Sequence, residues 1–335
     1  MKLKKRTTRN QIAARAGVSP AVVSFVLNNS NYVKASTRER VLKAIRELEY
    51  QPNLVARSLR TKQTNHLTLL GNDLLNPVFA EMAHAMSAVA YAQGFFVSVC
   101  NASKKENMDL LLQSNVAGIV VASDLFSQSQ LNEIARMNIA VVLVKNRDFR
   151  GKLDDSIITI EIDLLSAYRA AMRELASQGR RRVLYLSSPK LGGMDDLHLR
   201  FRFLCRVLDE VGLPFTEKQI IDNLLFDLGK LERSLIEKQA EVNPDLIVAG
   251  NDEFALLAIT LLKKMGVRIP SDVAVLGCDN IKSSEYISPG LSTIDIQKES
   301  IGASAAQALI DKIQGRAGKN KIILTTEWIR RESGG

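Results

Sequence analysis

Residues 9–28, RNQIAARAGVSPAVVSFVLN, predict two short helices joined by a tight turn. Thr8 can cap the first helix, and Gly17 permits the left-handed backbone that such a turn needs. Ser19 is a favourable N-cap for the second helix, and Pro20 suits its first position because that position has no intrahelical use for an amide hydrogen. The order helix, glycine turn, helix is typical of a helix-turn-helix unit.

A third helix is expected to close a small core with these two. Ser36 and Glu39 have the spacing of a capping box that would open a helix over residues 37–50. Its apolar side chains at helical spacing are Val41, Leu42, Ile45 and Leu48. The first helix contributes the apolar stripe Ile12, Ala13 and Ala16. A generic three-helix packing module is the alternative that these residues leave open.

The excess of basic charge is confined to this region. Residues 1–62 contain 14 Lys/Arg and 3 Asp/Glu, a net charge of +11, whereas the remaining 273 residues contain 31 and 33, a net charge of −2. A small and strongly basic segment is the electrostatic signature of a surface that binds a phosphate backbone. The asymmetry therefore favours a nucleic-acid-binding unit over a purely structural one.

After residue 64 the pattern changes to short apolar runs, such as HLTLLG at 66–71, which alternate with helical stretches. Examples of the helical stretches are 79–93, 164–178, 199–211 and 253–265. Uninterrupted apolar runs between helices are typical of parallel strands that are buried on both faces. The eight to ten expected strands are too many for one such sheet, so we predict an α/β core of two doubly wound lobes.

Composition excludes several other classes of protein. The chain has 335 residues and 46% hydrophobic content, enough for two or three domains with a large core. It has no long uncharged apolar run and no apolar segment after its basic start, so we expect a cytoplasmic protein without a membrane partner. Cys100, Cys205 and Cys278 are far apart in apolar surroundings, which favours buried thiols over disulfides or a metal site.

The chain resembles the lactose/galactose repressor (LacI/GalR) family. The resemblance is carried by IAARAGVSPAVVSFVLN at 12–28 and by VKASTRERVLKAIRELEYQPNLVARSLRTKQT at 33–64. It implies a transcriptional repressor, without cofactor, that binds a near-palindromic operator in double-stranded DNA as a homodimer and responds to a small, sugar-like effector. The domains implied are a helix-turn-helix domain at 1–52, a hinge at 53–64 and an effector-binding and dimerisation core at 65–335. Within the core, a periplasmic-binding-protein-like lobe 1 is expected at 65–163 and 294–322, and lobe 2 at 164–293 and 323–335.

The resemblance places the second helix in the DNA groove. Val22 and Phe25 stand where the family usually has Thr and Arg. Apolar side chains can contact thymine methyl groups but cannot form the bidentate hydrogen bonds that read guanine or adenine, so direct readout should be weak. The DNA-contacting residues expected in this domain are Thr8, Pro20, Ala21, Val22, Ser24, Phe25 and Asn28, of which Ser24 and Asn28 suit phosphates. Inward packing of Phe25 is the alternative.

The hinge is then expected to supply specificity. The resemblance implies that paired hinges become helical on DNA and enter the minor groove, where Leu59 parts a base step and Ala56 lets the two hinges approach. Arg57 and Arg60 would contact phosphates or the groove edge, and Asn53 completes the expected set. A wedge kinks DNA, so deformable pyrimidine–purine steps are favoured. In the absence of DNA, the same segment is expected to be a flexible linker.

Ligands of such lobes bind between them, at the carboxyl ends of the strands. The residues that the resemblance assigns to an effector are Asn72, Asn76, Phe79, Asn146, Arg147, Arg200, Asn251 and Asp279. Amides, carboxylates and an arginine suit a polyol, although Asn251 or Asp279 could simply cap a helix. Val78 and Asn146 depart from the family pattern, which leaves open an atypical sugar, a nucleoside, a phosphorylated metabolite, a protein corepressor or no effector.

Enzymatic functions find no support in the motifs. The sequence has no G-x-S-x-G, P-loop, dinucleotide-binding glycine motif or metal-spaced His/Cys cluster. The competing interpretation from another class is a cytoplasmic sugar-binding or sugar-metabolising protein with an appended basic domain. The tail after Trp328 lacks a leucine heptad, so a tetramer formed through a C-terminal coiled coil is not expected.

Overall fold

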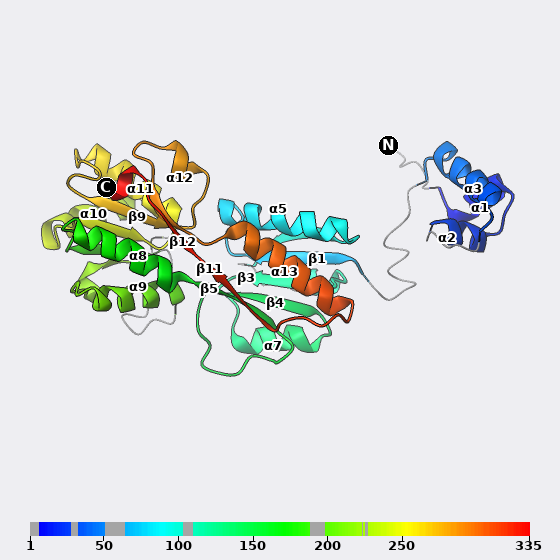
Figure 1. The fold of residues 1–335 in the computed structure, drawn as a ribbon, viewed down its shortest axis with the longest axis horizontal. Coiled ribbons are helices and arrows are strands. Elements are labelled where there is room, and N and C mark those ends of the chain that lie inside the picture. The colour runs from blue at the N-terminus through cyan, green and yellow to red at the C-terminus, as the bar shows by residue number, and fades with distance from the viewer. Residues whose placement is uncertain are drawn as a thin grey trace. The chain divides into compact units, whose positions relative to one another are not determined.

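The computed structural model describes residues 7–27, 33–50, 64–102, 110–187, 198–222, 224 and 227–335. The chain divides into two compact units, an N-terminal unit (Met1–Gln63) and a core unit (Thr64–Gly335) (Figure 1). In the described residues, no helix is long and apolar enough to cross a membrane.

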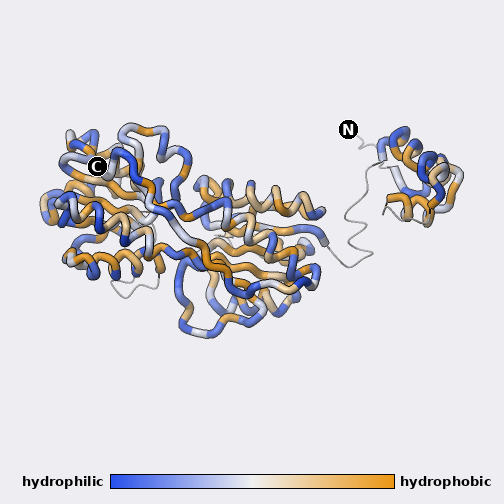
Figure 2. Tube along the Cα trace, viewed as in Figure 1, coloured by the Kyte–Doolittle hydropathy of each residue, from blue (hydrophilic) through white to orange (hydrophobic). Residues whose placement is uncertain are grey.

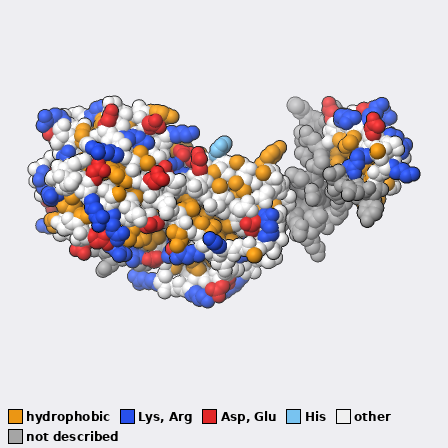
Figure 3. Space-filling view, in the orientation of Figure 1, with side chains coloured by type: hydrophobic (Ala, Val, Ile, Leu, Met, Phe, Trp, Pro, Cys, Tyr) orange, Lys and Arg blue, Asp and Glu red, His pale blue; other side chains and the backbone are white. Residues whose placement is uncertain are grey.

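The described part of the N-terminal unit contains the predicted helix-turn-helix. Its helices are α1 (Arg9–Ala16), α2 (Pro20–Leu27) and α3 (Ala35–Glu47). Thr8 caps α1 in a capping box with Gln11, and Gly17 takes a φ of 64° that a side chain would disfavour. The buried core residues are Ile12, Ala13, Ala16, Val23, Val26, Val41, Ala44 and Tyr50. Lys and Arg side chains are prominent on the visible face of this unit (Figure 3).

Two details of the third helix differ from the prediction. α3 begins at Ala35, and Lys34 at its N-cap makes no side-chain cap bond. The capping box of Ser36 and Glu39 is therefore wrong, because both residues lie inside the helix. Leu42 is 40% exposed and does not join the core, since it lies about 100° around the helix from the buried Val41.

Lobe 1 of the core unit is a six-stranded sheet with helices on both faces. The strand order is β11-β5-β4-β3-β1-β2, and all neighbours are parallel. The strands are β1 (His66–Gly71), β2 (Phe96–Asn101), β3 (Gly118–Ala122), β4 (Ala140–Lys145), β5 (Ile158–Asp163) and β11 (Lys321–Thr325). Helices α5 (Pro77–Ala92) and α13 (Lys298–Ile313) cover one face, and α7 (Gln128–Arg136) covers the other (Figure 1).

Lobe 2 repeats this architecture with one reversed edge. Its order is β12-β10-β9-β8-β6-β7, and only β12 is antiparallel to its neighbour. The strands are β6 (Val183–Leu186), β7 (Ile220–Ile221), β8 (Leu246–Ala249), β9 (Ala274–Cys278), β10 (Ser292–Asp295) and β12 (Glu327–Ile329). Helices α8 (Leu164–Ser177) and α9 (Leu199–Glu210) pack on one face, and α10 (Leu228–Glu241) and α11 (Asp252–Lys264) pack on the other. The short helices are α12 (Ser283–Tyr286), η2 (Glu217–Gln219) and η3 (Glu332–Gly334).

The predicted pair of doubly wound lobes is confirmed, although the strands of the described residues exceed the expected eight to ten. Three of the strands that apolar runs did not predict are the sheet edges β7, β11 and β12. An edge strand needs no continuous apolar run, because one side of it can face solvent. The fourth, β10, is short and contains the buried polar residues Ser292 and Thr293. The most hydrophobic segments lie along the central strands and the inner helix faces (Figure 2).

The chain crosses between the lobes three times. The first crossing follows β5 at Asp163, where the next residue opens α8. The other two lie a few residues later than the predicted 293 and 322, because β10 continues to Asp295 in lobe 2 and β11 continues to Thr325 in lobe 1. Of the cysteines expected to be buried, only Cys278 is fully so, whereas Cys100 and Cys205 are half-buried.

Candidate ligand cleft and recognition helix

A cleft of about 380 Å³ lies between the two lobes of the core unit. Its walls are built where the strands end: Asn72 follows β1 and Asn146 follows β4 in lobe 1, while Asn251 and Asp279 follow β8 and β9 in lobe 2. Parallel strands bring their carboxyl ends to one edge of each sheet, so residues far apart in the sequence converge on this space. The lining residues that had been predicted are Asn72, Asn76, Phe79, Asn146, Arg200, Asn251 and Asp279.

Arg147, the remaining predicted residue, does not line this cleft. Its guanidinium donates to the Phe126 carbonyl oxygen at 2.5 Å and lies 5.1 Å from the centre of the Phe149 ring. Both contacts hold the side chain within lobe 1. The backbone of Arg147 forms an isolated bridge with His198, which brings His198 to the cleft wall from lobe 2.

Arg200 and Asp279 form an ion pair at the lobe 2 wall. Arg200 is the second residue of α9, and its Nη2 lies 2.6 Å from Asp279 Oδ1. Its Nη1 donates to the Gly250 carbonyl oxygen at 2.5 Å. Burial raises the pKa of Asp279 to about 6, although the neighbouring guanidinium opposes the shift. The pair is therefore held in place without a ligand.

Asn76 and Asn251 cap helices and line the cleft at the same time. Asn76 Oδ1 accepts from the Val78 amide at 2.9 Å to begin α5, and Asn251 Oδ1 accepts from the Phe254 amide at 2.9 Å to begin α11. Asn76 Nδ2 also donates to Glu253 Oε2 at 2.8 Å, which links lobe 1 to lobe 2. The capping interpretation of Asn251 is thus correct, and it does not remove the residue from the site.

A second wall of the cleft is formed by Phe79 and Asn72 in lobe 1. The Phe79 ring packs on Gly71, where an added Cβ would lie 2.6 Å from Phe79 Cδ1. Asn72 Nδ2 donates to the carboxylate of Asp124. Among the described residues, nothing donates a hydrogen bond to the buried Asn72 Oδ1, so this wall contains an acceptor that the described part of the protein does not satisfy.

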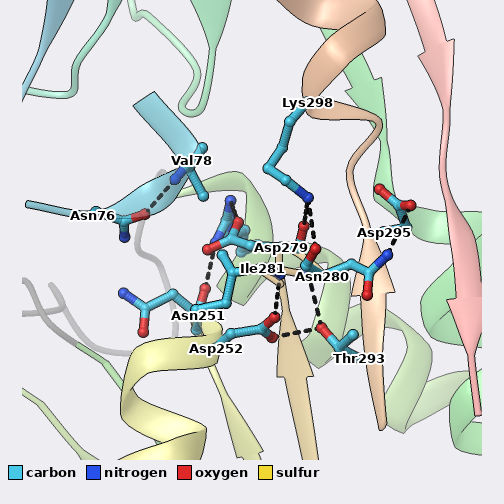
Figure 4. A network of polar contacts seen from close by, with 12 residues as sticks. Asn76, Val78, Asn251, Asp252, Asp279, Asn280, Ile281, Thr293, Asp295 and Lys298 are labelled. Atoms are coloured by element: carbon cyan, nitrogen blue, oxygen red, sulfur yellow. Dashed lines mark hydrogen bonds and ion pairs between the residues drawn. The ribbon is translucent and has the colours of Figure 1, made fainter. Parts of the chain in front are cut away.

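A polar network holds the segment after β9 that carries Asp279 (Figure 4). The buried Asp252 accepts from the Ile281 amide at 2.9 Å, from Ser284 Oγ at 2.7 Å and from Thr293 Oγ1 at 2.5 Å. Lys298, at the start of α13 in lobe 1, donates to the carbonyl oxygens of Asp279 at 2.5 Å and Asn280 at 2.8 Å. Because Lys298 belongs to lobe 1, the network joins the lobes directly behind the cleft.

The face of α2 that was predicted to meet DNA is exposed. Phe25 is 48% exposed, so its inward packing is excluded, and Val23 and Val26 fill the core in its place. Pro20 and Ala21 are exposed, while Val22 and Ser24 are half-buried.

The polar groups predicted in this unit already have intramolecular partners. Ser24 Oγ donates to the Pro20 carbonyl oxygen at 3.1 Å and accepts from Arg9 at 3.4 Å. Thr8 accepts from the Gln11 amide as a helix cap. The remaining predicted DNA contacts lie outside the described residues: Asn28, Asn53, Ala56, Arg57, Leu59 and Arg60.

Comparisons with known proteins agree with this architecture. A model of the lacI family of bacterial regulatory proteins matches residues 9–53, and a model of the periplasmic binding protein-like domain matches residues 172–334. The repressor PurR of Yersinia pestis is 30% identical over 318 residues, covering 91% of this chain and 90% of its own. The chain belongs to the LacI family. PurR of Histophilus somni is 27% identical over 324 residues, covering 94% and 95% of the two chains.

Solved structures show the same fold over nearly the whole of this LacI-family chain. The Lac repressor dimer bound to operator and the anti-inducer ONPF aligns with a TM-score of 0.81 at 24% identity, covering 98% of this chain and 99% of that one. A regulator from Alkaliphilus metalliredigens in complex with D-xylulofuranose aligns with a TM-score of 0.66 at 27% identity, covering 81% and 99%. The protein is thus a transcription regulator with a periplasmic-binding-protein-like effector domain and not an enzyme.

Several cleft residues of this LacI-family protein were not predicted from its sequence. Asp124 and Ser187 follow β3 and β6, so the rule that polar residues after apolar runs line the cleft would have found both. Lys145 and Tyr185 lie inside strands, where no such signal exists. His198, which is not in the predicted set, also lines the cleft, as Arg200 does.

Proposed function

We propose that this LacI-family regulator is a repressor that binds a near-palindromic operator as a homodimer, and that a small polar effector in the cleft changes its affinity for DNA. The observation that carries the proposal is the cleft itself, because both lobes contribute polar side chains to it. A ligand that contacts both lobes favours one arrangement of them over others. Such a change can alter DNA binding if the hinges at 53–64 respond to it.

The curated relatives and solved structures support the repressor and effector parts of the proposal. The relatives cited above are named as transcriptional repressors. A CelR structure is a complex with cellobiose, and a LacI-family regulator of Enterococcus faecium contains bound ribose. These proteins favour a polar, hydroxyl-rich effector for the cleft of this chain.

The homodimer is supported by a set of exposed apolar side chains at one edge of lobe 1. Tyr91 at the end of α5 is 85% exposed, and Phe96 and Val99 on β2 are 51% and 41% exposed. β2 is an edge of its sheet, so these side chains lie beside unpaired strand backbone. Exposed apolar groups next to an open edge are typical of surfaces that are covered by a second subunit.

The first experiment is a selection of binding sites from random duplex DNA with the full-length protein. The salt concentration must be fixed, because phosphate contacts dominate affinity. Recovery of a near-palindrome with a deformable central step and T-rich flanks supports a dimeric regulator that reads shape and methyl groups. Recovery of no motif, with and without candidate effectors, contradicts the proposal and favours a sugar-binding protein with a basic appendage.

Phe25→Ala should weaken binding to the selected site by about tenfold, the loss expected for one base contact. Because the side chain is exposed, the free energy of unfolding of the N-terminal unit should change by less than about 0.5 kcal/mol. Binding titrations and thermal unfolding measure the two effects. Val26→Ala is the matched control, since Val26 is buried and should lose stability. An unchanged affinity of the folded Phe25→Ala protein would remove Phe25 from the interface.

Leu59→Ala tests the wedge that we propose for the hinge. Loss of an inserted side chain should reduce affinity for the selected site by about tenfold or more, while nonspecific affinity, which depends on phosphate contacts, changes by no more than about twofold. Titrations against the selected duplex and a scrambled duplex at the same salt concentration give the ratio. Equal losses on both duplexes would show that Leu59 has no wedge function.

A further inference from the structure

The Lys and Arg side chains that line the cleft are already neutralised by the protein. Arg200 is paired with Asp279 at 2.6 Å. Lys145 Nζ lies 3.0 Å from Asp148 Oδ1 and 3.5 Å from Glu161 Oε1. Neither cation depends on a ligand for its counter-ion, so the described walls of the cleft offer no unpaired Lys or Arg to an anion.

Two carboxylates that line the cleft, those of Asp73 and Asp124, have only neutral partners among the described residues, and so does Glu253, which lies beside the cleft and is bonded to the lining residue Asn76. Asp73 Oδ1 accepts from the Leu75 amide at 3.0 Å, Asp124 accepts from the amide group of Asn72, and Glu253 Oε2 accepts from Asn76 Nδ2 at 2.8 Å. Within the described part of the chain, none of the three forms an ion pair. The described walls of the cleft therefore carry a net negative charge.

The neighbouring carboxylates affect the pKa of Glu253. It is half-buried, and its pKa is raised by burial and by the neighbouring carboxylates of Asp73 and Asp279. Asp73 belongs to lobe 1, whereas Glu253 and Asp279 belong to lobe 2. A positive charge placed between Asp73 and Glu253 would thus relieve a repulsion that acts across the two lobes.

Helix N-termini usually favour anions, but those at this cleft are already occupied. Asn76 and Asn251 satisfy first-turn amides of α5 and α11 with their own side chains. The first turn of α11 also contains Asp252 and Glu253, whose charges offset the positive end of the helix. Backbone dipoles therefore do not restore affinity for an anion.

We propose that the effector is a hydroxyl-bearing protonated amine, such as an amino sugar or an amino alcohol. Its ammonium would donate to Asp73 in the cleft and to Glu253, which lies beside the cleft against the lining residue Asn76, and so bind both lobes. Its hydroxyl groups would supply the hydrogen that Asn72 Oδ1 lacks, and its carbon skeleton would pack on the Phe79 ring. This inference rests on the proposed function, since it names the ligand class of the same cleft. Sugar phosphates and sugar acids are excluded by the same charges.

The test is calorimetry with the full-length protein at pH 7.5 and three matched sets of ligands. The sets are glucose, glucosamine and glucose 6-phosphate; galactose, galactosamine and galactose 6-phosphate; sorbitol, 1-amino-1-deoxysorbitol and sorbitol 6-phosphate. In at least one set the amine should bind about tenfold more tightly than the neutral compound, as expected for a charge-assisted hydrogen bond. The phosphate should bind more weakly than either. Phosphate binding that equals neutral binding, or the absence of any amine preference, overturns the proposal.

A pair of variants separates a charge effect from a structural one. Glu253→Gln keeps the shape of the side chain, and it should reduce the ratio of amine to neutral affinity from about tenfold to near one. Glu237→Gln, on the exposed surface of α10, is the matched control and should leave the ratio unchanged. Equal losses for amine and neutral ligands would assign Glu253 only a structural function. Site selection on DNA does not use these ligands, so it tests the proposed function independently.

Discussion

Gly302→Ala should lower the free energy of unfolding of the core unit by about 3 kcal/mol, the upper range for an overpacked core. Gly302 lies on α13, where an added Cβ would overlap the carbonyl oxygen of Met82 on α5. A backbone atom cannot rotate away as a side chain can, so one of the two helices must shift. Both helices cover the same face of the lobe 1 sheet, and the shift would disturb the core beneath them.

The control for this experiment is Gly229→Ala on α10. The nearest atoms to a Cβ at that position are side-chain atoms at 3.4 Å, an ordinary contact distance. Alanine is favoured over glycine in helices by up to about 1 kcal/mol, so this variant should be neutral or slightly more stable. Denaturant unfolding of both variants measures the difference. Loss of stability in neither variant would show that α13 and α5 do not approach as closely as the structure indicates.

Arg200→Ala should destabilise the core unit by about 3–5 kcal/mol at pH 7.5, the cost of leaving a buried charge without its partner. The side chain of Asp279 is only 3% exposed, so its carboxylate depends on the guanidinium of Arg200 for most of its charge compensation. Without Arg200 the pKa of Asp279 should rise further above about 6, since the opposing positive charge is gone. The folded variant then accepts a proton as the pH falls from 7.5 to 5, which the ionised carboxylate of the unfolded chain does not. The destabilisation should therefore shrink over this range.

Arg202→Ala provides the comparison for Arg200→Ala. Arg202 is on the same helix, α9, and pairs with Asp148, but its side chain is 43% exposed. An exposed ion pair contributes at most about 1 kcal/mol to stability, so the free energy of unfolding of this variant should be close to that of the wild type at both pH values. Denaturant titrations of both variants at pH 7.5 and pH 5 measure the free energies of unfolding that this comparison requires. A pH-independent loss of stability in Arg200→Ala would indicate that lost packing, and not the charge of Asp279, is responsible.

The fold was largely predictable because its signals are local. The cap at Thr8, the turn at Gly17 and the proline that begins α2 each act within a few residues, and the structure confirms all three. The apolar runs of the central strands were equally clear, since a strand buried on both faces needs an uninterrupted apolar sequence. The strands β7, β11 and β12 gave no such signal, because β7 has only two residues and β11 and β12 include exposed residues.

The candidate site was predictable only in part. Candidate residues could be named from their positions after strands together with the resemblance to the LacI/GalR family, and seven of the eight that were named line the cleft. Arg147 follows the same rule, yet it turns away because the Phe126 carbonyl and the Phe149 ring hold it in lobe 1. Whether a side chain after a strand enters the cleft depends on neighbours that are distant in sequence.

The sequence by itself determined the helix-turn-helix, the alternation of helices with the central strands, the basic N-terminal unit and the polar residues that follow those strands. Those features follow from periodicity, capping and charge, which act over a few residues. Only the tertiary structure decided that Arg200 is already paired with Asp279, that Asn76 reaches Glu253 across the lobes and that Asp124 accepts from Asn72 and has no cation among the described residues. Electrostatic interactions depend on distance in space and on burial, and neither can be read from positions along the chain.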